Sequence, residues 1–123
     1  MNGLILVFLG GGLGASARFG LGKVIPDGIL AIFSANLIGS FLMGLTMAWL
    51  LARSQAEGGA IWLFLCVGMF GGFTTFSSFS LHSVQMLQEG QVARAAMYVF
   101  GSAAGAIGLL FIGLEFGKRV FAQ

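Results

Sequence analysis

Long apolar segments alternate with short polar connections along the whole chain. Four segments stand out, at about 3–22, 29–52, 60–81 and 95–114. Each reaches the roughly 20 residues that a helix needs to cross the hydrocarbon core of a bilayer. The connections, 23–28, 53–59 and 82–94, are too short to form a domain outside the membrane. The pattern predicts an all-α membrane protein in which residues 1–123 form a single four-helix transmembrane domain.

The first apolar segment resembles the core of a signal peptide, because Ala15-Ser16-Ala17 follows it in the manner of a cleavage site. No Lys or Arg precedes the segment, however, whereas a signal peptide begins with a positively charged region. Further apolar segments also follow it. We therefore expect an uncleaved first helix.

The third apolar segment contains an unusual polar stretch, Gly71 to Ser80, with the sequence GGFTTFSSFS. Glycine weakens a helix, and Ser and Thr hydroxyls can bond to backbone groups that lose their helical partners. Within a membrane, irregular backbone is tolerated where it is buried in protein or lines a polar cavity. We predict that the third helix is broken here, near the membrane midplane.

Three other polar side chains lie in or beside the predicted helices. Arg18 either extends to the lipid headgroups or acts as an anchor or a positive charge at a vestibule that attracts anions. Asn36 either hydrogen-bonds between helices or donates to a bound anion, since its amide offers two N–H groups without a charge. His82, at the polar end of the third segment, is expected at the membrane interface, since a lone histidine beside a connection is more often interfacial than catalytic.

Small residues recur at helical spacing in two of the segments. Gly10 and Gly14 are four residues apart, an arrangement that lets two membrane helices approach closely. In the fourth segment Gly101 and Gly105, with Ser102 and Ala106 beside them, form a broader face of the same kind. We expect both faces to pack against neighbouring helices.

The composition restricts the possible functions. The chain is 58% hydrophobic and 8% charged, which excludes a soluble enzyme, and no pair of a nucleophile and a base is evident. We therefore expect no enzymatic activity. The six basic residues are scattered between apolar segments, so we expect no nucleic-acid partner. Cys66 stands alone in an apolar run and predicts neither a disulfide nor a metal site.

The basic residues are evenly divided between the two sides of the predicted bundle. With four spans, the termini and the 53–59 connection share one side, which carries Arg53, Lys118 and Arg119. The other side carries Arg18, Lys23 and Arg94. The positive-inside rule then gives no preferred orientation. Either something else fixes the topology, or the chain inserts in both orientations and forms an antiparallel homodimer that joins two copies of the 71–80 stretch. Four helices leave little room for a polar path, so we expect an oligomer in both cases.

The motifs resemble those of a known family. The stretch GGFTTFSSFS at 71–80 matches the pattern GG-x-TTFS-[ST]-FS, Gly14 to Arg18 matches a first-helix G-xxx-R, and Ala35-Asn36-Leu37 matches a second-helix N-L. The chain is similar, over nearly its whole length, to the Fluc (CrcB-type) fluoride-specific ion channels. The resemblance implies a dual-topology antiparallel homodimer in the bacterial inner membrane that lowers cytoplasmic fluoride by passive export.

The resemblance also implies roles for individual residues. A structural, untransported sodium ion at the dimer centre would be held by the backbone carbonyls of Gly71 and Thr74. Fluoride would pass along the ring edges of Phe76 and Phe79, which carry partial positive charge. The matching polar and aromatic pore positions are Asn36, Ser77, Ser78 and Tyr98. From its hydroxyl and its place in the stretch, Thr75 is a further candidate donor.

The chain departs from the family pattern at two positions. His82 stands where relatives often have a glutamate at the vestibule, and a histidine can be neutral or positively charged near physiological pH. Ala106 stands where relatives often have a serine, so one expected donor is missing. Ser102, one helical turn earlier, is a possible substitute that the sequence leaves open.

Two other functions compete with a fluoride channel. One is a small proton-coupled multidrug exporter, which needs a carboxylate inside a span to exchange protons for cations. The four acidic residues, however, lie at or beyond the span ends: Asp27, Glu57, Glu89 and Glu115. The other is a structural membrane protein in which the 71–80 hydroxyls merely cap a kink. Polar groups in a span are costly, which disfavours that alternative.

Overall fold

The computed structural model describes residues 2–55 and 57–122, and within them every regular element is a helix. The order along the chain is α1 (Gly3–Val24), α2 (Gly28–Ala52), η1 (Trp62–Phe70), α3 (Gly71–Phe73), α4 (Phe76–Gln88) and α5 (Val92–Phe121). η1 is a π-helix that runs directly into α3. Four stretches are long and apolar enough to cross a membrane: Gly3–Val24, Gly28–Ala52, Trp62–Gln88 and Val92–Phe121. The all-helical, four-span architecture predicted from the hydrophobic pattern is thus confirmed.

Polar side chains fix the beginnings of the first two helices. The Asn2 side chain accepts a hydrogen bond from the Leu4 amide at 3.0 Å. Asp27 caps α2 in the same way, with 2.9 Å to the Ile29 amide and 3.1 Å to the Leu30 amide. Each cap satisfies N–H groups that have no partner within the helix.

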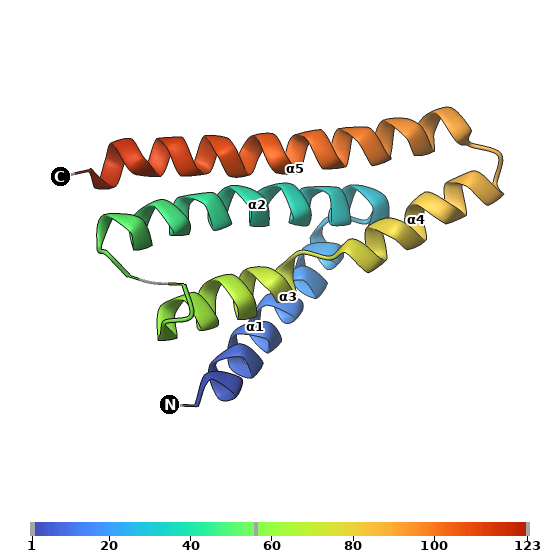
Figure 1. The fold of residues 1–123 in the computed structure, drawn as a ribbon. Coiled ribbons are helices and arrows are strands. Elements are labelled where there is room, and N and C mark those ends of the chain that lie inside the picture. Colours follow the sequence, from blue (N-terminus) through green and yellow to red (C-terminus); the bar gives the residue numbers. More distant parts are fainter. Residues whose placement is uncertain (1, 56, 123) are drawn as a thin grey trace.

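The helices α2 and α5 lie side by side and run in the same direction along most of their length (Figure 1). Glycines permit this approach: Gly44 faces the Leu110 carbonyl, and Gly113 faces the Phe41 carbonyl, each so closely that a β-carbon would overlap the neighbouring backbone. The small-residue face expected at Gly101 and Gly105 contributes less. Gly105 lies against Leu37, while Gly101 has open space beside it. The close contact of α5 therefore lies further along the helix than the sequence pattern predicted.

The helix α1 crosses η1 and α3 through a second glycine contact. Gly10 faces the Phe64 carbonyl and Gly14 faces the Met69 carbonyl, and no β-carbon would fit at either position. Gly72, on α3, makes the same kind of contact with α1: a β-carbon added to Gly72 would lie 2.5 Å from the Gly11 carbonyl oxygen. The close packing predicted for Gly10 and Gly14 is confirmed.

Two helices extend well beyond the apolar segments that define them. α4 continues to Gln88, so His82 lies within a helix and not in the connection that the sequence suggested. α5 begins at Val92 and continues to Phe121. Backbone hydrogen bonding does not stop where hydropathy falls, because polar side chains at a helix end can reach water while the helix persists. Both termini lie at the same end of the molecule as the connection between α2 and η1 (Figure 1).

A small share of each span is buried within the single chain. Between 11% and 22% of the residues in the most apolar window of each span are buried. One buried cluster joins Leu50, Cys66 and Phe70, with Trp49 and Trp62 packed against it. A second joins Met86, Ala95 and Tyr98. The remaining apolar surface faces lipid or another protein.

Candidate functional site

The helix that contains the GGFTTFSSFS stretch is interrupted at Thr74 and Thr75. α3 ends at Phe73 and α4 begins at Phe76. Between them Thr74 has φ −84° and ψ 158°, and Thr75 has φ −153° and ψ 119°, both extended conformations. The Thr74 amide still donates to the Phe70 carbonyl at 2.9 Å, but the extended backbone cannot continue the i to i−4 hydrogen bonds beyond it, so the N–H and C=O groups that follow need other partners.

Hydroxyl groups within the interruption supply some of those partners. Thr74 Oγ1 donates to the Phe70 carbonyl at 2.8 Å. Thr75 Oγ1 accepts from the Ser78 amide at 3.1 Å and so caps the start of α4. The same oxygen lies 3.2 Å from Ser77 Oγ and 3.3 Å from Ser78 Oγ. The first turn of α4 therefore carries a cluster of three hydroxyls.

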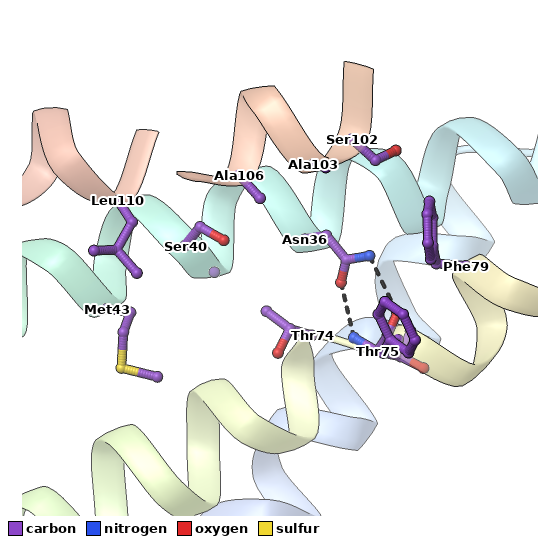
Figure 2. A pocket seen from close by; sticks show the side chains of 12 residues that line it. Asn36, Ser40, Met43, Thr74, Thr75, Phe79, Ser102, Ala103, Ala106 and Leu110 are labelled. Atoms are coloured by element: carbon purple, nitrogen blue, oxygen red, sulfur yellow. Dashed lines mark hydrogen bonds between the residues drawn. The ribbon is translucent and has the colours of Figure 1, made fainter. Parts of the chain in front are cut away.

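Asn36, on α2, holds the peptide backbone of Thr75 from both sides. Its Oδ1 accepts from the Thr75 amide at 2.8 Å, and its Nδ2 donates to the Thr75 carbonyl at 3.1 Å (Figure 2). The interhelical role that the sequence left open for Asn36 is therefore present in the structure. The amide keeps one further N–H, which is free to face the adjoining cavity.

Arg18, on α1, donates from Nε to the Gly72 carbonyl at 3.2 Å. It is therefore an anchor for α3, one of the roles that the sequence left open. Among the described residues no donor reaches the carbonyl oxygens of Gly71, Phe73 or Thr74. The interruption thus has two carbonyls that are held by side chains from other helices and three that have no hydrogen-bond donor among the described residues.

A cavity of about 290 Å³ lies between α2, α5 and the interruption (Figure 2). It brings together five of the predicted site residues: Asn36, Thr74, Thr75, Phe76 and Phe79. Other residues that line it are Gly39, Ser40, Met43, Ser102, Ala103, Ala106 and Leu110. The lining is mostly apolar, with an amide and hydroxyl groups as its polar members.

Aromatic rings form a continuous row beside this cavity. The ring centroids of Phe76 and Phe79 are 5.4 Å apart, and those of Phe79 and Tyr98 are 5.3 Å apart. The planes are tilted by 43° and 40°, so ring edges are presented as well as faces. Phe76 is 79% exposed on the single chain, while the Tyr98 hydroxyl is buried and has no hydrogen-bond partner. Tyr98 therefore lies at the inner end of the row and Phe76 at its open end.

The structure places Ser102, a possible substitute for the missing serine, at the cavity and adds Ser40 to the candidate residues. Ser102 is 6% exposed, its Oγ has no partner, and it lines the cavity beside Ala106. Its position one turn before Ala106 was the available signal in the sequence. Ser40 lies one turn after Asn36 on the same face of α2, and the fold shows that it borders the cavity.

A second cavity, of about 360 Å³, lies against another face of α4 and is basic in character. Arg18, Lys23, Ser78 and His82 all line it. The two residues predicted for a vestibule, Arg18 and His82, are thus brought together. The buried Nδ1 of His82 has no hydrogen-bond partner.

Three of the predicted residues line neither cavity: Gly71, Ser77 and Tyr98. Ser77 and Gly71 are exposed on the surface of the single chain. No group of three His, Cys, Asp or Glu side chains that could hold a metal ion occurs within residues 2–55 and 57–122. A cation at this site would therefore depend on backbone oxygens.

Comparison with known proteins agrees with these features. The family model described as "CrcB-like protein, Camphor Resistance (CrcB)" matches residues 5–114. A protein of Hyphomonas neptunium named "Fluoride-specific ion channel FluC" is 42% identical, over 99% of this chain and 100% of the relative. A protein of the same name from Thermus thermophilus is 43% identical, over 95% and 96%. Together with the four membrane-length helices, these similarities identify a multi-pass membrane protein.

Proposed function

The chain belongs to the CrcB-like family, and from that premise we propose that it is a fluoride-selective channel that lowers cytoplasmic fluoride by passive export. The observation that carries the proposal is the row of Phe76 and Phe79 beside a cavity whose polar lining is uncharged. The edge of a phenyl ring carries partial positive charge. An anion can therefore be stabilised along the row without meeting a full cation that would trap it.

We assign successive roles along the path. The basic cavity of Arg18, Lys23 and His82 concentrates anions at the entrance. Fluoride is strongly hydrated, so removing its water demands several donors in sequence. Thr75, Ser77 and Ser78 at the start of α4 provide the first of them. Tyr98 and Ser102, whose buried hydroxyls lack partners, provide donors further in, and Ser102 replaces the serine that is missing at Ala106.

A release assay tests this proposal. Purified protein is reconstituted into liposomes loaded with potassium fluoride or potassium chloride, and the anion that leaves is measured with an ion-selective electrode. We expect rapid fluoride release and retention of chloride. Equal release of the two anions would remove the claim of selectivity, and retention of both would remove the claim of a channel.

The multidrug exporter is not favoured by the arrangement of the acidic residues. Asp27 caps α2 and lies 4.0 Å from Arg94 Nη2. Glu115 pairs with Lys118 near the end of α5 at 2.6 Å. Neither these residues nor Glu57 and Glu89 line the two cavities described above. A carboxylate positioned to exchange a proton for an organic cation is therefore not among the lining residues.

We propose further that the working unit is an antiparallel homodimer. The equal distribution of basic residues supports insertion in both orientations. The low burial of each span leaves apolar surface for a second copy, and Phe76, at the open end of the aromatic row, is among the exposed residues. A partner copy would cover this ring and complete the wall of the path.

A structural sodium ion at the centre of that dimer is also part of the proposal. Hard cations prefer oxygen ligands, and helix breaks in membrane proteins use freed carbonyls in this way. The carbonyls of Gly71 and Thr74 fit this role because no donor in the described chain reaches them. Two from each copy would give the ion four oxygen ligands.

Removing sodium tests the ion independently of transport. Purified protein is exchanged into buffer in which a large organic cation replaces sodium, and the thermal unfolding midpoint and the dimer fraction are measured. We expect both to fall and to recover when sodium is restored. The organic cation is too large for a site made by four carbonyls. Identical values in the two buffers would contradict the site.

A further inference from the structure

The helix α2 presents two neighbouring positions to the interruption. Asn36 and Gly39 are three residues apart and therefore share one face of the helix. Asn36 holds the Thr75 peptide by the two hydrogen bonds described above. Gly39 is buried directly against Thr74, and a β-carbon added to it would overlap the Thr74 methyl carbon and lie 3.3 Å from Phe73 Cδ1. The two residues of the interruption thus contact neighbouring positions on this face of α2: Thr75 contacts Asn36, and Thr74 contacts Gly39.

The Thr74 side chain is fixed in the orientation that points its methyl group at Gly39. Its Oγ1 donates to the Phe70 carbonyl at 2.8 Å. A β-branched side chain has few allowed rotamers, so rotation that moves the methyl group away also breaks this hydrogen bond. The methyl group can therefore leave Gly39 only if the backbone of Thr74 moves too.

We propose that Gly39 is a positioning residue of the ion path: its missing side chain forms the seat for the Thr74 methyl group, and so sets where the Thr74 backbone lies. The inference rests on the proposed channel function, since the atoms positioned are the open Thr74 carbonyl and the start of the Phe76–Phe79 row. Gly39 itself offers no donor, charge or ring to an anion.

The test compares four variants with the wild-type chain. Gly39→Ala fills the seat. Thr74→Ser removes the methyl group while keeping the hydroxyl that bonds to Phe70. The double variant Gly39→Ala/Thr74→Ser removes the overlap. Gly12→Ala is the matched control, because Gly12 lies mid-helix in α1 with nothing within 4 Å of an added β-carbon.

Two properties are measured: fluoride release from liposomes, and hydrogen–deuterium exchange of the peptide that spans 74–76. We expect Gly39→Ala to slow release by about tenfold or more and to speed exchange, because the displaced Thr74 pulls Thr75 from Asn36. We expect Gly12→Ala to stay close to wild type; Thr74→Ser provides the reference level for the double variant, because Thr74 itself belongs to the proposed site. The double variant should recover both properties, an outcome that a general effect of the alanine would not give.

Several outcomes would overturn the inference. One is a Gly39→Ala protein with wild-type release and exchange. Another is a double variant as impaired as Gly39→Ala. If Gly39→Ala does not fold, recovery of a folded double variant supports the seat and its failure to fold overturns it. If wild-type protein releases no fluoride, the channel proposal fails, and the exchange measurements alone decide the role of Gly39.

Discussion

At the residue scale, the irregular backbone at Thr74 and Thr75 is supported by side chains that make specific bonds to it. The need for such support follows from the sequence, since hydroxyls cluster where glycines weaken the helix. The local bonds of Thr74 and Thr75 could be anticipated for this reason. The bonds from Asn36 and Arg18 could not be predicted, because they join residues 39 and 54 positions apart. Periodicity within one helix carries no information about such pairs.

The phenylalanine row gives a prediction at this scale. Replacing both Phe76 and Phe79 by Ile keeps apolar bulk but removes the positive ring edges. We expect fluoride release to fall to the level of empty liposomes while the protein still elutes as a dimer. Phe8→Ile on α1, where Phe8 is 76% exposed, is the control and should release fluoride normally. Unaltered release by the double variant would exclude the two rings from the path.

At the element scale, hydropathy located every span, but it did not locate the helix ends or all the close contacts. The glycine pair of α1 was recognisable because both members face the same neighbour. In α5 the glycines are spread around the helix, and only the fold shows that Gly113 and Gly117 meet α2 while Gly101 meets nothing. A small-residue pattern identifies a possible contact face, and the partner helix decides which part of it is used.

The contact between α1 and η1 gives the prediction at this scale. Gly14→Ala places a methyl group against backbone atoms of Met69. Backbone atoms within a helix cannot move aside as the end of a flexible side chain can. We expect the free energy of unfolding to fall by about 1–3 kcal/mol, the usual cost of overpacking. Denaturant unfolding in detergent measures it. The control Gly12→Ala should be neutral or slightly stabilising because alanine favours the helix; equal effects of the two substitutions would contradict the backbone contact.

At the scale of the whole molecule, the single chain covers little of its own apolar surface, and its charges give no orientation. Two observations favour a second copy: the even division of basic residues, read from the sequence, and the exposed end of the aromatic row, seen in the structure. The arrangement of a second copy follows from neither, because it depends on a surface match that one chain does not show.

Orientation can be biased to test the proposed antiparallel pair. Gln55→Lys with Glu57→Lys adds positive charge on the side of the termini, and Gln88→Lys with Glu89→Lys adds it on the other side. Each of the two double variants should insert in a single orientation, which is measured by thiol labelling of an engineered terminal cysteine. We expect little fluoride release from cells or liposomes with either variant alone and recovery when both are co-expressed. Full activity of each variant alone would contradict an antiparallel unit.

The anchoring of the interruption also bears on how the protein is made. The side chains that hold it, Arg18 and Asn36, both precede Gly72 and Thr75 in the sequence. Chains are synthesised from the N-terminus, so α1 and α2 exist before the third span leaves the ribosome. Unpaired backbone groups in hydrocarbon cost several kcal/mol each. The third span, which cannot satisfy all its own peptide groups, therefore enters the membrane after α1 and α2. The side chains that bind those groups are already in place when it arrives.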